Sequence, residues 1–332
     1  MPLDPGENPP DGLPLDLEGA AKEVHVLLDS DPAEALPALR RRLAALLMEG
    51  KDAKDFSKRL AFVEAGLRLT LQSGEDDSLF VLVQMLSDRQ YGYSATHALL
   101  AASTCLLVAP MAGIAEPQLA SLVRAALTMN IAMTEMQDLL ATQAHQTTPY
   151  QREAIESHPT EGVDILKALG VNDTLWLELV QDHHESDDGQ GYPNHKVQLS
   201  IHQQILRMSD LFIAQISPRT SRRGLWPNVV VAKLYNESQR RSSPLGSFFA
   251  KQLGMYPPGS YVKLHSGETA VVISRGARVN APVAMAIMDP ANLPLSKPIK
   301  RNCEVPKFAI KSPVSPEDIR IRLDRSRLLK RV

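Results

Sequence analysis

Apolar residues recur at helical spacing along most of the first 250 positions of the chain. The first such stripe consists of Leu36, Leu39, Leu43, Leu46 and Leu47. The four residues 31–34 before it form a capping box with proline at the first helical position. This pattern predicts a helix that kinks or restarts at Pro37. The same spacing predicts helices over 55–72, 76–87, 94–109 and 117–140.

Three further helices are indicated by the residues that open them. Thr148 begins a capping box, and the helix it opens should stop at Gly170 and break or restart at Pro159. Asp173 can cap the next helix, which ends in a pair of histidines. Ser200 can cap a helix that follows.

The pattern changes after about residue 252. Short apolar runs at 261–264, 270–273 and 283–288 predict strands, and alternating charged and apolar residues over 316–332 predict a peripheral helix. The sequence therefore predicts a mainly α protein with a small C-terminal β appendage. We expect five segments: a disordered tail over 1–19, an N-terminal helical region over 20–88, a main helical domain over 89–252, the β appendage over 253–312 and a C-terminal tail over 313–332.

Composition narrows the class of protein. The chain has 332 residues, 44% of them hydrophobic, which is enough for a sizeable core. A formal net charge of −2 excludes bulk nucleic-acid binding. Two distant cysteines and the lack of a signal-peptide pattern favour a reducing, cytoplasmic compartment. The uncharged stretch 95–115 is rich in small residues and contains histidine and proline, so we expect a buried helix and no membrane span.

The run 183–193, HHESDDGQGYP, concentrates the candidate chemistry. Imidazole and carboxylate groups together suit divalent first-row metals. Neighbouring helix positions point about 100° apart, so His183 and His184 should bind two adjacent metals, or one should bind while the other packs. Alternatively, both histidines interact only with the last carbonyls of their helix.

The same run resembles the HHE-DGxGYP signature of the HD-GYP domain family, metal-dependent phosphohydrolases of the HD superfamily that cleave cyclic di-GMP. The resemblance covers roughly residues 90–290. Other segments match in the family's order, namely 91–97, AALTMNIAM at 125–133, His158-Pro159, RMSD at 207–210 and RTSR at 219–222. It implies an HD-superfamily helical bundle.

The resemblance also implies the residues of a site. The metal ligands that it carries over are His97, His158, His183, His184 and Asp210, for a divalent transition metal such as iron or manganese. Arg219 and Arg222 would reach ligand phosphate. The GYP loop would comprise Asp188, Gly189, Gly191, Tyr192 and Pro193. The implied partners are cyclic di-GMP and a signalling protein such as a diguanylate cyclase.

Several positions depart from the family pattern. Met129-Asn130 stands where the family has its His-Asp pair, and Met133 stands where its lysine follows. Tyr93 replaces a metal-binding glutamate of many members, and Ile213 replaces the second aspartate of a D-x-x-D helix. An amide lacks the charge of a metal-bridging carboxylate, so we expect hydrolysis to be absent or severely weakened.

Three functions follow from this combination. The first is a degenerate HD-GYP protein that binds cyclic di-GMP or a signalling partner with little or no hydrolysis. The second is a residual metal-dependent phosphodiesterase, and the third is a helical scaffold with a relic motif. On the scaffold hypothesis, His97 is a core histidine, Asp210 pairs with Arg207, and the two methionines fill the core.

Overall fold

A computed structural model describes residues 31–88, 92–321 and 323–329. The predicted tail over 1–19 and the start of the N-terminal region lie outside these residues. The helices of the described part are α2 (Pro32–Glu49), α3 (Phe56–Ser73), α4 (Glu75–Leu86), α5 (Ser94–Val108), α6 (Gln118–Thr128), α7 (Thr134–Thr142), α8 (Pro149–Ala168), α9 (Thr174–Asp182), α10 (Ile201–Ile216), α11 (Pro227–Arg240), α12 (Leu245–Leu253) and α13 (Arg325–Leu329). Short 3₁₀ turns include η3 (Ala109–Ala112), η4 (Ile131–Met133) and η6 (Pro316–Asp318).

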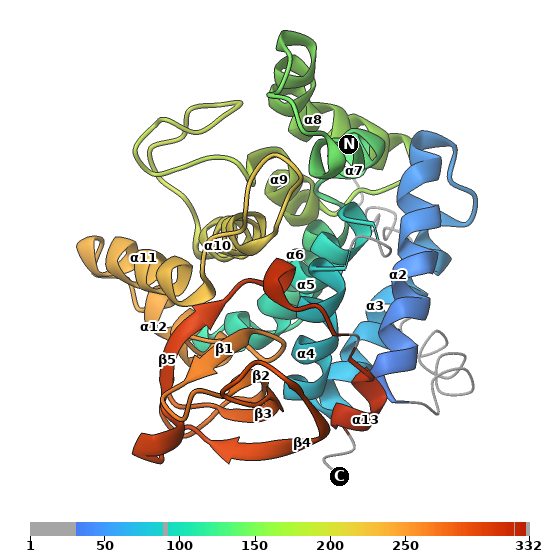
Figure 1. Cartoon of the computed structure of the whole chain (residues 1–332). Helices are drawn as coiled ribbons and strands as arrows, with labels where there is room; N and C mark the ends of the chain where they lie inside the picture. The colour runs from blue at the N-terminus through green and yellow to red at the C-terminus, as the bar shows by residue number, and fades with distance from the viewer. Residues whose placement is uncertain (1–30, 89–91, 322, 330–332) are drawn as a thin grey trace, which may run out of the picture.

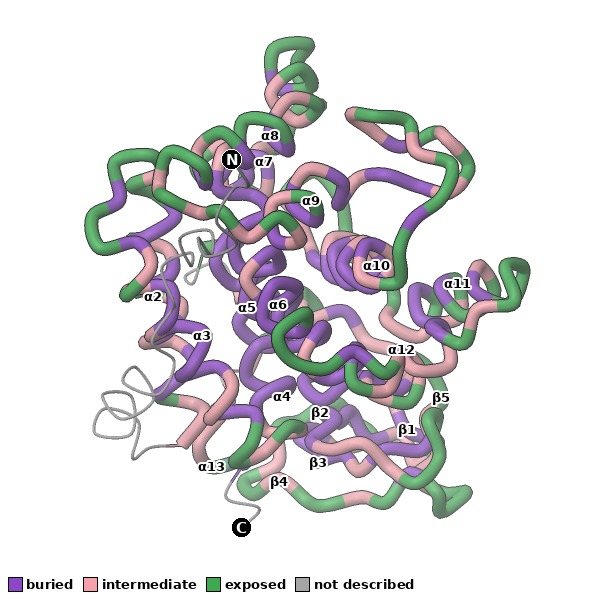
Figure 2. The backbone as a smooth tube through the Cα atoms, turned by 180° about the vertical axis from the view of Figure 1, so that it is seen from behind, coloured by how far each residue is buried: buried purple, intermediate pink, exposed green. Residues whose placement is uncertain are grey.

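Helix α5 lies at the centre of the helical part. It packs against α2, α4, α6, α10 and α12, and Figure 2 shows it buried along its length. The stretch Ser94–Ala112 is long and apolar enough to cross a membrane, yet 78% of its most apolar window is buried inside the protein. This burial agrees with the predicted core helix. Tyr93 and His97 lie at the N-terminal end of α5, where the candidate site described below begins.

Neither helix restarts at its proline, and one break was missed. Helix α2 is continuous through Pro37, and α8 is continuous through Pro159. The predicted helix over 117–140 is instead divided into α6, η4 and α7, because the chain turns at Asn130. The carbonyl of Asn130 accepts from the backbone N–H of Met133 at 3.0 Å, closing a turn that the continuing apolar spacing conceals.

The C-terminal part is a five-stranded antiparallel sheet in the order β4-β3-β2-β1-β5. Three of its strands were predicted, β1 (Tyr261–Leu264), β2 (Thr269–Ser274) and β3 (Val283–Met288). The edge strands β4 (Pro294–Asn302) and β5 (Ile310–Val314) were missed, because each contains proline and lacks a continuous apolar run, and β4 is also mostly exposed with three basic residues. The predicted tail helix over 316–332 is reduced to η6 and the short α13.

The sheet packs against the helical part through α4 (Figure 1). The Gln84 amide donates to the backbone carbonyl of Gly259 at 2.6 Å and accepts from the Tyr261 hydroxyl at 3.0 Å. Arg275 of the sheet pairs with Glu75 and Asp76 at the start of α4, both at 2.5 Å. The β appendage is therefore held directly on the helix next to α5.

Candidate metal centre

The first part of the site is built at the N-terminal end of α5. The backbone N–H groups of Tyr93 and Ser94 both donate to the Asp138 carboxylate of α7, at 2.9 and 2.7 Å. A carboxylate at a helix N-terminus satisfies free N–H groups and favours the helix dipole. Asp138 therefore fixes the helix end that carries Tyr93 and, one turn later, His97.

His97 forms a buried hydrogen-bonded chain with Tyr93 and Asp210. Its Nε2 lies 2.8 Å from Oδ1 of Asp210 on α10, and its Nδ1 lies 3.0 Å from the Tyr93 hydroxyl. Burial alone would lower the pKa of His97, but Tyr93 and Asp210 outweigh burial and raise it to about 9. The imidazolium thus donates to Oδ1 of Asp210 while its other nitrogen faces the Tyr93 hydroxyl, so His97 presents no free ring nitrogen to a metal. The expected Asp210–Arg207 pair is wrong, since Arg207 contacts Glu237 instead.

The second part of the site begins with His158 in the middle of α8. Pro159 has no N–H, so the Ile155 carbonyl lacks the donor that would come from position 159. The His158 Nδ1 takes that place, donating to the Ile155 carbonyl at 2.6 Å. This bond explains why the helix continues through the proline. It also fixes the imidazole tautomer and leaves Nε2 without a proton.

His183 follows the last residue of α9 and is fixed in the same way. Its Nδ1 donates to the Val180 carbonyl at 2.7 Å. Its Nε2 lies 3.1 Å from the Nε2 of His158. Burial lowers the pKa of His183 and lowers that of His158 to about 3, so both rings are neutral at pH 7. Two unprotonated nitrogens therefore face each other across a gap that a cation would fill.

His184 completes a cluster of three histidines. One ring nitrogen from each of His158, His183 and His184 lies within 4.8 Å of the others. The rings of His183 and His184, expected to serve two metals or to leave one ring packed, lie with their centroids 4.2 Å apart just after α9 ends at Asp182. The His184 ring also stacks on Tyr192 of the GYP loop, with ring centroids 4.7 Å apart.

These residues fit one divalent metal. Three neutral imidazoles, two of them with tautomers fixed by backbone carbonyls, are a donor set that zinc, iron and related metals accept. Asp210 is near enough to counteract, by its charge, the fall in pKa of His183 and His184. A second metal would require His97 and Asp210 to break their ion pair. Of the predicted ligands, the structure therefore brings three into one cluster and pairs the other two with each other.

The positions that depart from the family pattern are buried beside this cluster. Met129, Asn130, Met133 and Ile213 are all less than 9% exposed. A Cβ on Gly162, one turn after His158, would contact Val180 of α9, Ile131 and the carbonyl of Met129. The turn at 129–131 is thus packed against both histidine-bearing helices. This turn places Met129 and the neutral amide of Asn130 at positions where a negative charge would favour metal binding.

The GYP loop folds back on the histidine pair. A Cβ on Gly191 would overlap the backbone of Glu185 and Ser186, so only glycine fits this close approach. Gly189 has φ of +71°, and the exposed Asp188 accepts from Ser186 and from the backbone of Gln190. The peptide bond before Pro193 is cis. Asp188 therefore shapes the turn of the loop.

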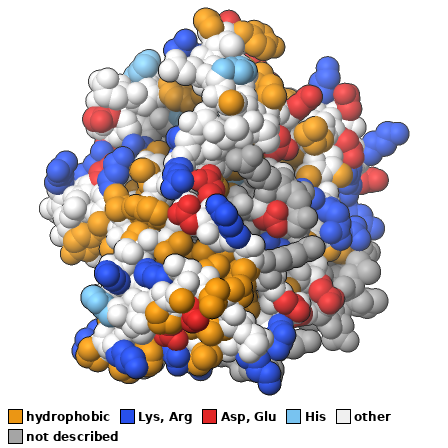
Figure 3. Space-filling view, viewed as in Figure 1, with side chains coloured by type: hydrophobic (Ala, Val, Ile, Leu, Met, Phe, Trp, Pro, Cys, Tyr) orange, Lys and Arg blue, Asp and Glu red, His pale blue; other side chains and the backbone are white. Residues whose placement is uncertain are grey.

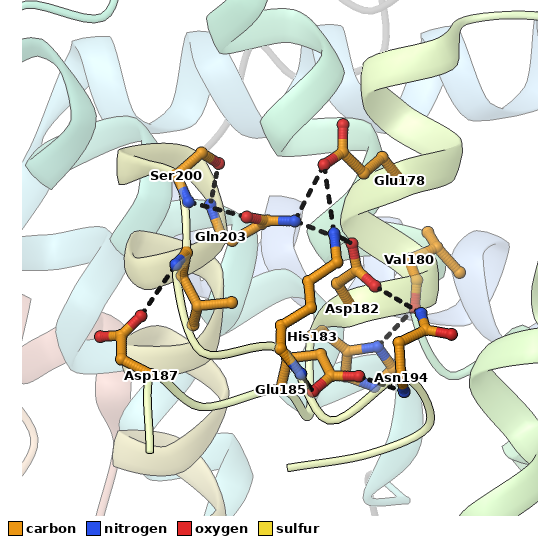
Figure 4. Close-up of polar contacts among 11 residues, drawn as sticks. Glu178, Val180, Asp182, His183, Glu185, Asp187, Asn194, Ser200 and Gln203 are labelled. Carbon is orange, nitrogen blue, oxygen red and sulfur yellow. Dashed lines mark hydrogen bonds and ion pairs between the residues drawn. The ribbon is translucent and has the colours of Figure 1, made fainter. Parts of the chain in front are cut away.

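Two buried carboxylates on either side of the histidine pair fix this loop, as Figure 4 shows. Glu185 accepts from the backbone N–H groups of Asn194 and Lys196. Asp182 accepts from the Lys196 ammonium at 2.5 Å, the Gln203 amide at 2.8 Å and the Asn194 amide at 3.1 Å. Sequence reasoning missed Asp182, Asn194, Lys196 and Gln203. Their only signal was an acid directly before the histidine pair and a lysine shortly after Tyr-Pro.

The two arginines of the loop after α10 lie on the Tyr93 side. The guanidinium of Arg219 is 5.5 Å from the centre of the Tyr93 ring, and its buried Nε has no hydrogen-bond partner. Arg222 is exposed and donates to the Ala214 carbonyl at 2.7 Å. A tight turn joins them through backbone bonds of 2.9 and 3.2 Å. Both cations therefore stand near the His97 chain, as a phosphate-binding role requires.

Comparisons with known proteins agree with this geometry. Residues 81–242 match the family model described as HD domain. The chain is 22% identical over 273 residues to the cyclic di-GMP phosphodiesterase PA4108 of Pseudomonas aeruginosa. That alignment covers 80% of this chain, which spans 65% of the relative's length.

A solved structure shares the fold. Bd1817, an HDG"Y"P protein from Bdellovibrio bacteriovorus, superimposes with a TM-score of 0.50 at 12% identity, over 70% of this chain and 75% of that one. This neighbour thus shows a shared fold. The HD-domain match, the curated relative and the solved structure together fit the HD-GYP family, in agreement with the resemblance of the 183–193 run.

Proposed function

We propose that the protein is a degenerate HD-GYP protein in cyclic di-GMP signalling, which binds cyclic di-GMP or a signalling partner and hydrolyses the nucleotide little or not at all. The observation that carries this proposal is the Tyr93–His97–Asp210 chain. It engages both ring nitrogens of His97 and one carboxylate oxygen of Asp210, the two residues that a second metal would need, while the three-histidine cluster is kept.

Recognition would rest on the two sides of the site. A first-row metal held by His158, His183 and His184 would supply a positive charge for one phosphate oxygen. Arg219 and Arg222, which lie on the Tyr93 side, would hold the phosphate from the other side. Tyr192 would keep His184 oriented through the stacked rings. Cyclic di-GMP has two phosphates, so the metal could bind one of them and the two arginines the other.

Weak hydrolysis follows from the charges that are missing. A hydroxide nucleophile at neutral pH is best generated between two close cations. Asn130, Met129 and Ile213 add no negative charge for a second metal, and Met133 cannot stabilise phosphate charge. A residual phosphodiesterase is the second candidate. It is favoured by the three neutral imidazoles and by the nearby Asp210, which could still hold one working metal.

The test separates binding from turnover. Purified protein is incubated without oxygen with cyclic di-GMP and Mn²⁺ or Fe²⁺; bound nucleotide is measured by calorimetry and products by chromatography. We expect binding that falls at least tenfold in Arg219→Ala/Arg222→Ala and is unchanged in Arg240→Ala, an exposed arginine of α11. Product that disappears in His183→Ala/His184→Ala would favour the phosphodiesterase. If the protein neither binds cyclic di-GMP nor forms product, the scaffold hypothesis remains.

A further inference from the structure

An apolar groove of about 590 Å³ lies between the helical part and the sheet. Its walls come from α4, from the segment between α10 and α11, and from β1 and the end of β5. Three aromatic rings and several proline rings line it, including Trp226, Tyr256, Tyr261, Pro218, Pro313 and Pro316. In Figure 3, apolar side chains gather on the face between α11 and the sheet.

The groove is exposed and its walls are fixed. Leu225 is 48% exposed and Trp226 38% exposed at its rim, although both are large apolar residues. The N–H of Leu225 donates to the Gln215 carbonyl at 2.8 Å, and a Cβ on Gly224 would overlap the Ile216 carbonyl. The opposite wall is held by the Gln84 bonds to Gly259 and Tyr261. A ligand would therefore meet a preformed surface.

The chemistry of this surface suits a proline-rich peptide. Grooves lined by tryptophan, tyrosine and proline bind polyproline-type segments, because proline rings pack flat on aromatic faces and the ligand loses little entropy. The chain itself supplies such a segment outside the described residues. Positions 2–18 contain five prolines and four leucines, and PLDP at 2–5 has the P-x-x-P spacing.

Charge and reach favour the same segment. Positions 2–18 carry five acidic side chains and no Lys, Arg or His. Next to the groove, Arg223 is 67% exposed and engaged only by long contacts to Glu317 and Asp318, at 3.4 and 3.8 Å, which an incoming carboxylate can replace. The segment joins α2, which packs on the wall helix α4. Thirteen residues separate position 18 from Pro32, roughly 40 Å in extended form.

We propose that this groove binds the proline-rich, acidic segment 2–18 of the same chain. The inference does not depend on metal or nucleotide. Pro218 and Trp226 flank the loop that carries Arg219 and Arg222, so binding of the segment would bear on the same loop that forms the candidate phosphate site.

The test uses Trp226 as its reporter. The chain has two tryptophans, and Trp176 is buried at 4% exposure, so acrylamide quenches mainly Trp226. We compare the full chain with a variant lacking residues 2–18. The deletion should shift emission to longer wavelength and raise the quenching constant at least twofold. A synthetic peptide of residues 1–18, added in trans, should reverse both changes, and neither should occur in a Trp226→Phe background.

Two controls separate the proposed occupant from others. A peptide of the same charge with its prolines replaced by alanine should fail to protect Trp226. Equal quenching in the full chain and the deletion variant would overturn the proposal, and so would equal protection by the alanine peptide. Protection that depends on protein concentration, with a dimer seen by light scattering, would assign the groove to a second copy and also overturn it.

Discussion

The Nε2 atoms of His158 and His183 lie 3.1 Å apart, and both Nδ1–H groups are already donated to backbone carbonyls. No proton is left to lie between the two nitrogens in their neutral form. Such a pair is unfavourable in the absence of a cation and becomes a chelating pair in its presence. The two backbone hydrogen bonds therefore raise the metal affinity, because they keep both Nε2 atoms unprotonated before a metal binds.

The first prediction concerns metal removal. At a free metal concentration of 100 times Kd, binding adds about 2.7 kcal/mol to the free energy of unfolding. Chelation should then lower Tm by roughly 5 °C or more. Differential scanning fluorimetry with and without chelator measures the shift. The His183→Ala/His184→Ala variant should show none, and an unshifted Tm in the natural protein would contradict a metal centre.

The second prediction concerns metal stoichiometry. The natural protein should bind one metal per chain, because His97 and Asp210 are bonded to each other. Met129→His/Asn130→Asp restores a histidine and a carboxylate at the buried turn beside α8 and α9, and should raise the ratio toward two, measured by plasma mass spectrometry. Asn236→Asp, on the exposed side of α11, adds the same carboxylate as a control. A ratio that stays at one would indicate that the Tyr93–His97–Asp210 chain alone excludes the second metal.

The third prediction concerns pH in metal-free protein. The folded pKa of His97, about 9, lies above its ordinary 6.5, so its ion pair stabilises fully below pH 6.5 and is lost as pH rises through 9. The pKa of Asp210 is lowered because hydrogen bonding and the charge of His97 outweigh burial, so its contribution is lost in acid below about pH 4.

Urea unfolding between pH 6 and pH 10 measures this loss, which should be at most about 3 kcal/mol. Asp210→Asn removes the carboxylate and should flatten the profile over the alkaline range. Parallel profiles for the two proteins would show that another group causes the dependence.

The fourth prediction concerns Lys196. Its ammonium is the cation bonded to the buried Asp182, and its N–H is bonded to Glu185. Lys196→Ala leaves Asp182 with amide donors only, which should cost about 3 kcal/mol of stability and lower metal affinity about tenfold.

Lys196→Arg should recover most of the metal affinity, and Lys233→Ala, on an exposed lysine of α11, should match the natural protein. The electronic spectrum of bound Co²⁺ reports the geometry of the three imidazoles directly. A destabilised Lys196→Ala protein with unchanged Co²⁺ affinity and spectrum would limit Lys196 to a purely structural role.

Much of the helical architecture was predictable, because caps and apolar stripes act over neighbouring residues. Asp173 and Ser200 cap helices as expected, and the buried α5 follows from its composition. The turn at Asn130 was not predictable from periodicity, since apolar residues continue through it. The edge strands β4 and β5 contain proline and lack a continuous apolar run, so their pairing depends on the strands beside them.

For the site, the residue types were predictable and their partners were not. His158, His183 and His184 meet as the family resemblance implied. The bond between His97 and Asp210 joins residues 113 positions apart and depends on how α5 and α10 pack. The position of Lys196 shortly after Tyr-Pro was a weak signal, because a lysine in a loop is usually solvated.

Pro159 has no side-chain atom that can bind a metal, yet it sets which nitrogen of His158 can do so. Alanine at this position would bring back a backbone N–H that competes with the His158 ring for the Ile155 carbonyl. The imidazole could then carry its proton on the nitrogen that faces His183, where it would block a metal. In this helix, the missing amide hydrogen of Pro159 decides which tautomer His158 adopts. The His-Pro dipeptide therefore supplies the donor nitrogen and also keeps that nitrogen unprotonated.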